Sequence, residues 1–110
     1  MTGIVLQLTE AEFQAQVIQY AVLRGWDWMH VERMGDRKGW RTPTKGTIRQ
    51  WPDLTLLRGH RMVYAELKAQ KAPPPPQAQK DVLSKLSMVP GNEVYVWRPS
   101  DWPLIAEVLA

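Results

Sequence analysis

The chain contains no cysteine. This absence excludes disulfide bonds, thiolate catalysis and cysteine-based zinc sites. No apolar run approaches the roughly 18 residues that a membrane-spanning helix needs. The first residues do not show a basic segment followed by an apolar one, so we expect no signal peptide and no membrane association. The expected location is the cytoplasm.

The chain does contain enough apolar material for one core, together with a small excess of positive charge. Of its 110 residues, 45% are hydrophobic and 23% are charged, and the net charge is +3 with a pI near 9.5. This length predicts a single domain over residues 1–110. A mildly basic chain is compatible with binding to nucleic acid, which is a polyanion.

Apolar periodicity and turn residues predict three helices and four strands. The first helix is expected to begin after Thr9 as N-cap and to stop at Gly25, and Ser100 is expected to cap the last helix. The helices are predicted at 9–24, 77–89 and 100–109, and the strands at 26–31, 53–58, 61–69 and 93–98. The order α-β-β-β-α-β-α predicts an α/β domain with a mixed central sheet flanked by helices.

Two stretches between these elements have no helical or strand pattern. Residues 32–50 are rich in glycine and charge and are expected to form a mobile basic loop. Loops of this length are uncommon in compact domains and are often functional. Residues 71–76 include four prolines and are expected to form a stiff connector.

The two central strands are predicted to form a tight hairpin with Gly59-His60 as its turn. A two-residue turn fixes the register, so Arg58 faces Arg61 and Asp53 lies directly opposite Glu66. Side chains alternate between the two faces along a strand. The predicted apolar face consists of Leu54, Leu56, Val63, Ala65 and Leu67. The predicted polar face consists of Asp53, Thr55, Tyr64, Glu66 and Lys68.

Asp53 and Glu66 should repel each other, because like charges directly opposite on a sheet face are destabilising. A divalent cation between them reverses that effect, since Mg²⁺ binds one or two carboxylates together with phosphate oxygens. Lys68 points the same way as Glu66 and could contact a phosphate there. The competing interpretation is a simple salt bridge between Lys68 and Glu66, with Asp53 exposed at the end of its strand.

The stretches "PDLTLL" and "YAELKA" resemble the PD-(D/E)xK nuclease signature, with Pro52-Asp53 followed by Glu66-Leu67-Lys68. The stretch "EAEFQAQVIQYAVLRGW" and the closing "EVYVWRPSDW" resemble the virus-type replication-repair nuclease family, VRR-NUC. The resemblance implies a restriction-endonuclease-like fold and a divalent-metal-dependent nuclease of DNA repair. It also implies that stand-alone members from phages or bacteria act as homodimers on branched DNA such as four-way (Holliday) junctions, in the bacterial or phage-infected cell.

Carried over to this chain, the resemblance implies that Asp53, Glu66 and the backbone carbonyl of Leu67 hold Mg²⁺ or Mn²⁺. It implies that Lys68 is the catalytic lysine. The run Pro73–Pro76 departs from the family pattern and leaves the path from Lys68 to the next helix open.

Two helical residues join the candidate catalytic set through the same resemblance. Glu12 corresponds to the acidic residue of the first helix and is a further candidate metal ligand; its alternative role is a capping box with Thr9. Gln79 corresponds to the helix glutamine and is expected to face inward; its alternative role is to bond free backbone N–H groups at the helix start. Gln16 lies one turn after Glu12. It is expected either to donate a hydrogen bond to a metal ligand or to be an ordinary exposed glutamine.

The 32–50 loop is expected to contact DNA. Its glycines allow close backbone approach and Trp40 could stack on a base. The alternative is a solvated loop that only aids solubility. The expected DNA-binding residues are Arg33, Arg37, Lys38, Arg41, Lys45 and Arg49.

These features predict a metal-dependent endonuclease that hydrolyses DNA phosphodiesters, above all at four-way junctions. The alternatives are a flap, nick or single-strand nuclease, and a DNA-binding module with a nuclease fold but no cleavage. A symmetric homodimer is expected, because two strands of a junction must be cut and two-fold symmetry is the commonest in oligomers. The alternative is a monomer whose six tryptophans all lie in the core.

Overall fold

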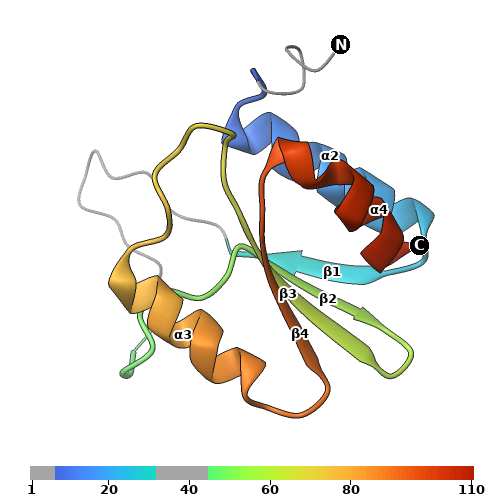
Figure 1. Ribbon diagram of the computed structural model, residues 1–110. Coiled ribbons are helices and arrows are strands. Elements are labelled where there is room, and N and C mark those ends of the chain that lie inside the picture. Colours follow the sequence, from blue (N-terminus) through green and yellow to red (C-terminus); the bar gives the residue numbers. More distant parts are fainter. Residues whose placement is uncertain (1–6, 32–44) are drawn as a thin grey trace.

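The computed structural model describes residues 7–31 and 45–110 (Figure 1). Within these ranges the predicted order α-β-β-β-α-β-α is confirmed, and every boundary lies within two residues of its predicted position. The elements are α2 (Glu10–Leu23), β1 (Asp27–His30), β2 (Leu54–Arg58), β3 (Arg61–Leu67), α3 (Gln77–Ser87), β4 (Asn92–Trp97), the short 3₁₀ helix η2 (Pro99–Asp101) and α4 (Trp102–Leu109).

The four strands form one mixed sheet in the order β1-β2-β3-β4. The β1–β2 and β2–β3 pairs are antiparallel and the β3–β4 pair is parallel. A parallel pair needs a crossover connection, and α3 provides it between β3 and β4. Helices α2 and α4 lie side by side on one side of the sheet, and α3 lies on the other side next to β4 (Figure 1). The sheet is therefore covered on both faces, as predicted.

The predicted hairpin register is confirmed. Leu54 pairs with Ala65 and Arg58 pairs with Arg61. Gly59 has a φ of 59°, whereas His60 has a negative φ. A positive φ at the first turn position alone is typical of a type II′ turn, which requires glycine there. The local chemistry of two turn residues thus sets which side chains meet along both strands.

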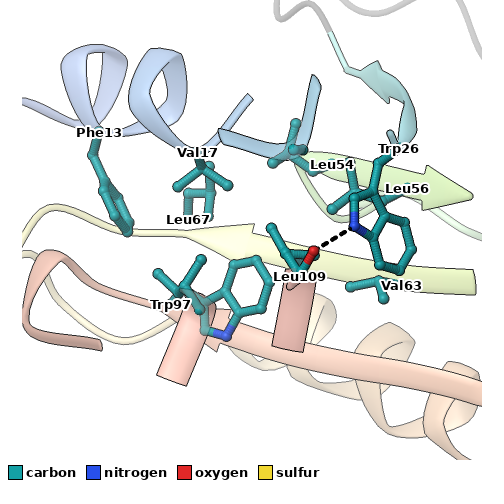
Figure 2. Close-up of a cluster of buried hydrophobic side chains, with 12 residues drawn as sticks. Phe13, Val17, Trp26, Leu54, Leu56, Val63, Leu67, Trp97 and Leu109 are labelled. Carbon is teal, nitrogen blue, oxygen red and sulfur yellow. Dashed lines mark hydrogen bonds between the residues drawn. The ribbon is translucent and has the colours of Figure 1, made fainter. Parts of the chain in front are cut away.

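The hydrophobic core lies between the apolar face of the hairpin and the helix pair α2 and α4 (Figure 2). Trp26 closes one end of this core, and its indole N–H donates a hydrogen bond to the carbonyl of Leu109 at 2.9 Å. The predicted apolar face is confirmed, because all five of its side chains are fully buried. Other fully buried members are Phe13, Val17, Ala21, Ile105 and Leu109.

The last helix begins differently from the prediction. Ser100 does not cap it, because residues 99–101 form a 3₁₀ turn and Asp101 occupies the N-cap position, where its side chain makes no cap hydrogen bond to α4. The carboxylate of Asp101 accepts a hydrogen bond from the N–H of Arg98 at 2.8 Å. A proline at position 99 favours such a tight first turn, since its φ is already suitable.

The proline-rich connector has a defined path. The guanidinium of Arg98 donates hydrogen bonds to the carbonyls of Ala69 and Ala72 at 2.7 and 2.9 Å, which ties the chain leaving β3 to the end of β4. Residues 73–76 then run without helix or strand into α3, with Pro75 buried. The connector therefore leads into α3 on the sheet face that carries Glu66.

Of the predicted 32–50 loop, residues 45–50 contain no helix or strand, and 32–44 lie outside the described residues. Within the described ranges no helix has the length and apolarity to cross a bilayer.

Candidate metal centre

Asp53 and Glu66 meet at the open end of the hairpin. Asp53 directly precedes β2, where its carbonyl accepts a hydrogen bond from the N–H of Val31 at 2.9 Å. Glu66 is the second-to-last residue of β3. The exposed fractions of Asp53 and Glu66 are only 6% and 4%. The alternative interpretation is therefore wrong in leaving Asp53 exposed, although the salt bridge that it expected between Lys68 and Glu66 is present.

Each carboxylate is held by the backbone of the other strand. The N–H of Asp53 donates to Glu66 Oε1 at 3.2 Å, and the N–H of Leu67 donates to Asp53 Oδ2 at 2.9 Å. Hydrogen bonds from backbone amides to carboxylates are charge-assisted and directional. The two bonds fix the orientation of both acids relative to each other, which is the preorganisation that a metal site needs.

Among the described residues, Lys68 compensates the negative charge of Glu66 only in part. Lys68 Nζ lies 3.8 Å from Glu66 Oε2, a weak contact, and the Lys68 side chain is 18% exposed. Burial, and next the charge of Asp53, raise the pKa of Glu66 to about 7; Lys68 opposes this shift without cancelling it. Without a cation, Glu66 is therefore about half protonated at neutral pH.

The donor set fits a hard divalent cation. Among the described residues no group of three or more His, Cys, Asp or Glu side chains is placed to hold a metal. The described side chains thus offer two carboxylates, leaving the remaining positions to a backbone carbonyl, water or substrate. Mg²⁺ and Mn²⁺ are commonly bound in this way, whereas structural zinc sites take four nitrogen or sulfur ligands.

Glu12 does not complete this pair in the structure. Its carboxylate accepts the N–H of Thr9 at 2.9 Å, and the Thr9 hydroxyl accepts the N–H of Glu12 at 3.1 Å. The two bonds form the capping box, and the bond from the Thr9 backbone is the main cause that lowers the pKa of Glu12. The capping role of Glu12 is therefore confirmed. Gln16 is exposed and accepts the indole N–H of Trp102 at 3.2 Å, so it links α2 to α4.

Gln79 faces inward as predicted. It lies in the first turn of α3, where it and Leu83 are the buried residues of the helix, and it is 2% exposed. Its backbone N–H donates to the carbonyl of Pro76 at 3.0 Å. The inward position predicted from helical spacing is therefore confirmed, with the side chain packed in the interior instead of exposed.

An aromatic group lies beside the acidic pair on the same sheet face. Tyr64 precedes Glu66 by two residues in β3 and is buried. The Trp51 ring meets the Tyr64 ring edge to face at 5.6 Å, and its indole N–H donates to the Thr55 hydroxyl at 3.4 Å. No motif in the sequence singled out Trp51 for this position. The alternation that puts Thr55 and Tyr64 on the polar face was the available signal.

The predicted DNA-binding residues are only partly within the described ranges. Lys45 and Arg49 are exposed, which is what contact with a phosphate backbone requires. The predicted residues Arg33, Arg37, Lys38 and Arg41 lie outside the described residues.

Comparison of the chain with protein-family models, curated proteins and solved structures gave no match.

Proposed function

We propose that the protein is a divalent-metal-dependent endonuclease that hydrolyses DNA phosphodiesters, and that it is a member of the VRR-NUC family with a restriction-endonuclease-like fold. The observation that carries this proposal is the buried pair Asp53 and Glu66, held by reciprocal backbone bonds with Lys68 alongside. A buried pair of acids is costly unless it is protonated or binds a cation. In a nuclease this free-energy cost favours binding of a divalent ion, because the ion neutralises the two acids.

The chain's own groups would divide the work as follows. Asp53 and Glu66 would hold Mg²⁺ or Mn²⁺, with the Leu67 carbonyl as a third ligand. A divalent ion bound there supplies Lewis acidity toward phosphate and water. Lys68 lies 3.8 Å from Glu66 and is partly exposed, so it can stabilise negative charge that develops on the phosphate or orient the attacking water. The buried amide of Gln79 would orient water or a ligand from the helix side.

The proposed substrate is branched DNA, above all a four-way junction, and the proposed working unit is a homodimer in the cytoplasm of a bacterial or phage-infected cell. The exposed cations Lys45 and Arg49 support contact with a phosphate backbone. A binding module without catalysis is less favoured, because two buried acids facing a DNA groove repel phosphate and serve no purpose in binding alone.

The experiment is cleavage of a panel of end-labelled DNAs with Mg²⁺ or Mn²⁺. The panel contains a four-way junction, a flap, a nicked duplex, an intact duplex and a single strand of matched sequence. We expect symmetric paired nicks in the junction by the wild-type protein, much slower nicking by Lys68→Ala, and none in EDTA. Lys71→Ala, which changes an exposed lysine nearby, serves as the matched control and should cleave normally.

The outcomes separate the candidate functions. Preferential cutting of the flap, nick or single strand would replace the junction as substrate and keep the nuclease. Binding to DNA without cleavage by any metal would leave only the binding module. Cleavage that persists at the wild-type rate in Lys68→Ala and in EDTA would point to a contaminating nuclease and would contradict the proposed site.

A further inference from the structure

A pocket of about 410 Å³ lies between the segment 47–51 and helix α3. Ligand pockets usually have volumes of roughly 300–1,000 Å³, so this one suits a small group better than a folded partner. Its walls combine apolar side chains from the segment and the helix with two cations. The lining residues used below are Ile48, Arg49, Trp51, Val82, Lys85 and Leu86.

The pocket is connected to the region of the acidic pair through Trp51. Trp51 lines it and lies two residues before Asp53 in the chain. The same indole contacts Tyr64, which shares a sheet face with Glu66. A DNA strand whose scissile phosphate is at the acids would therefore place a neighbouring nucleotide near this pocket.

The walls of the pocket are preorganised. Trp51 is held by its edge-to-face contact with Tyr64 and by its hydrogen bond to Thr55. Val82 and Leu86 are half-buried on one stripe of α3, because residues four apart lie on the same helix face. A rigid apolar wall with an aromatic side chain suits a flat ring, because little conformational freedom is lost when the ring enters.

The charges at the pocket suit a phosphate next to that ring. Arg49 and Lys85 are both exposed at the lining. The one acid in the lining, Asp81, accepts a hydrogen bond from the side-chain amide of Gln77 at 2.8 Å. Two cations against one engaged acid leave a net positive rim. A flat apolar interior with a positive rim matches a nucleotide, whose base is flat and whose phosphate is anionic.

We propose that this pocket accepts an unpaired nucleobase of the DNA substrate while Arg49 and Lys85 contact its flanking phosphates. The inference rests on the proposed function and sharpens it, because it makes an unpaired base at a branch point the feature that the protein selects. A fully paired duplex cannot fill the pocket unless a base leaves the stack, and that costs free energy.

The test uses two duplexes that each carry one 2-aminopurine, either unpaired as a single-base bulge or paired with thymine in the same sequence. Binding is measured in EDTA, so that no cleavage occurs. We expect the bulged duplex to bind about tenfold more tightly, as a single stacked base typically provides. We also expect 2-aminopurine emission to fall on binding, because the base stacks against the pocket wall.

Two variants and one control locate the effect. Val82→Phe fills the pocket and should remove the tenfold preference while leaving the affinity for paired duplex unchanged. Lys85→Ala, a surface truncation that should not disturb folding, should weaken binding to the bulged duplex by a few-fold. Lys80→Ala changes an exposed lysine of the same helix that does not line the pocket, and it should affect both duplexes equally.

Equal affinity of the wild-type protein for both duplexes would overturn the inference, and a peptide would then be the better occupant. A preference that survives in Val82→Phe, or equal effects of Lys85→Ala and Lys80→Ala, would overturn it as well. Because the binding needs no metal, failure of the nuclease proposal is distinguishable: it would appear as absent cleavage with an intact preference for the bulge.

Discussion

Like charges meet at both ends of the β2–β3 hairpin, and the two pairs differ in the partners that surround them. At the turn, Arg58 lies opposite Arg61, and at the open end Asp53 lies beside Glu66. Both pairs follow from one register, and both would be destabilising without partners. The difference lies in how many partners the rest of the chain supplies.

Each member of the arginine pair has several partners within the protein. The guanidinium of Arg58 donates to the carbonyls of Arg24 and Ala110 at 2.8 and 2.9 Å. Arg61 binds both carboxylate oxygens of Glu93 at 2.7 Å, and this contact raises the pKa of Arg61. Both guanidiniums also lie over the Trp26 ring, at 4.4 and 5.0 Å from its centroid. These contacts join the turn end of the hairpin to the ends of α2 and α4 and to β4, which is a structural role.

The acid pair is more deeply buried, and among the described residues Glu66 has only a weak counter-charge. The Lys68 ammonium lies 3.8 Å from Glu66, and the pKa of Glu66 remains raised to about 7. The raised pKa means that the contacts of Glu66 do not offset its burial and the charge of Asp53. The comparison therefore supports a structural role for the turn end of the hairpin, and it supports the proposed metal site at the open end.

The largest expected effect is the loss of cleavage at the open end without loss of the fold. Asp53→Asn and Glu66→Gln should each abolish metal-dependent cleavage, because each removes a ligand. In the metal-free protein near pH 8 their thermal stability should equal or exceed that of the wild type, since a repulsion is removed. Gel assays of junction cleavage and thermal melting by circular dichroism measure both effects. Wild-type cleavage by either variant would refute the site.

Loss of Lys68 should reduce the rate and leave the acid pair intact. Lys68→Ala should lower single-turnover cleavage by about 10²–10³-fold, as for removal of one charge-stabilising donor. Affinity for Mn²⁺ should remain within a few-fold, because the carboxylates are untouched. A rate loss explained wholly by weaker metal binding would instead make Lys68 a structural partner of Glu66.

The stability of the metal-free protein should fall as pH rises through neutrality. The folded-state pKa of Glu66, about 7, lies above the reference value of 4.5, so protonated Glu66 stabilises the fold fully below pH 4.5. That contribution is lost as the pH rises through about 7. At about 1.4 kcal/mol per pH unit, the loss is on the order of 3 kcal/mol. Urea unfolding across this range should show the fall in the wild type and a flatter profile in Glu66→Gln; parallel profiles would contradict the account.

At the turn end of the hairpin, replacing Arg58 by a neutral residue should destabilise the protein. Arg58→Ala removes hydrogen bonds to backbone carbonyls and a cation–π contact, so we expect a loss of about 2 kcal/mol in the free energy of unfolding. Arg24→Ala is the matched control, because the Arg24 side chain is exposed and only its carbonyl receives Arg58. A change within about 0.5 kcal/mol for Arg58→Ala would remove the contrast between the two ends.

The parts of the fold that follow local rules could be predicted from the sequence. The Gly59-His60 turn fixes the register, and the register brings Asp53 to Glu66. The buried position of Gln79 follows from helical spacing in the same way. Glu12 is different, since its family correspondence and its capping box made competing predictions, and the structure shows the local contact with Thr9.

The remaining features depend on contacts between distant segments. The hydrogen bonds of Arg58 require α4 to end beside the hairpin turn, and no local pattern encodes that position. The path of the Pro73–Pro76 run depends on Arg98, which lies beyond α3 in the chain. The reciprocal backbone bonds of the acid pair depend on side-chain rotamers, which a register does not determine.

The central claim, that Asp53 and Glu66 form a divalent metal site, is tested most directly by calorimetric titration of the metal-free protein with Mn²⁺ at about pH 8, which is above the raised pKa of Glu66. We predict that the wild type binds Mn²⁺ and that the double variant Asp53→Asn with Glu66→Gln, folded by circular dichroism, does not. Equal binding by both proteins, or no binding by the wild type, would contradict the account.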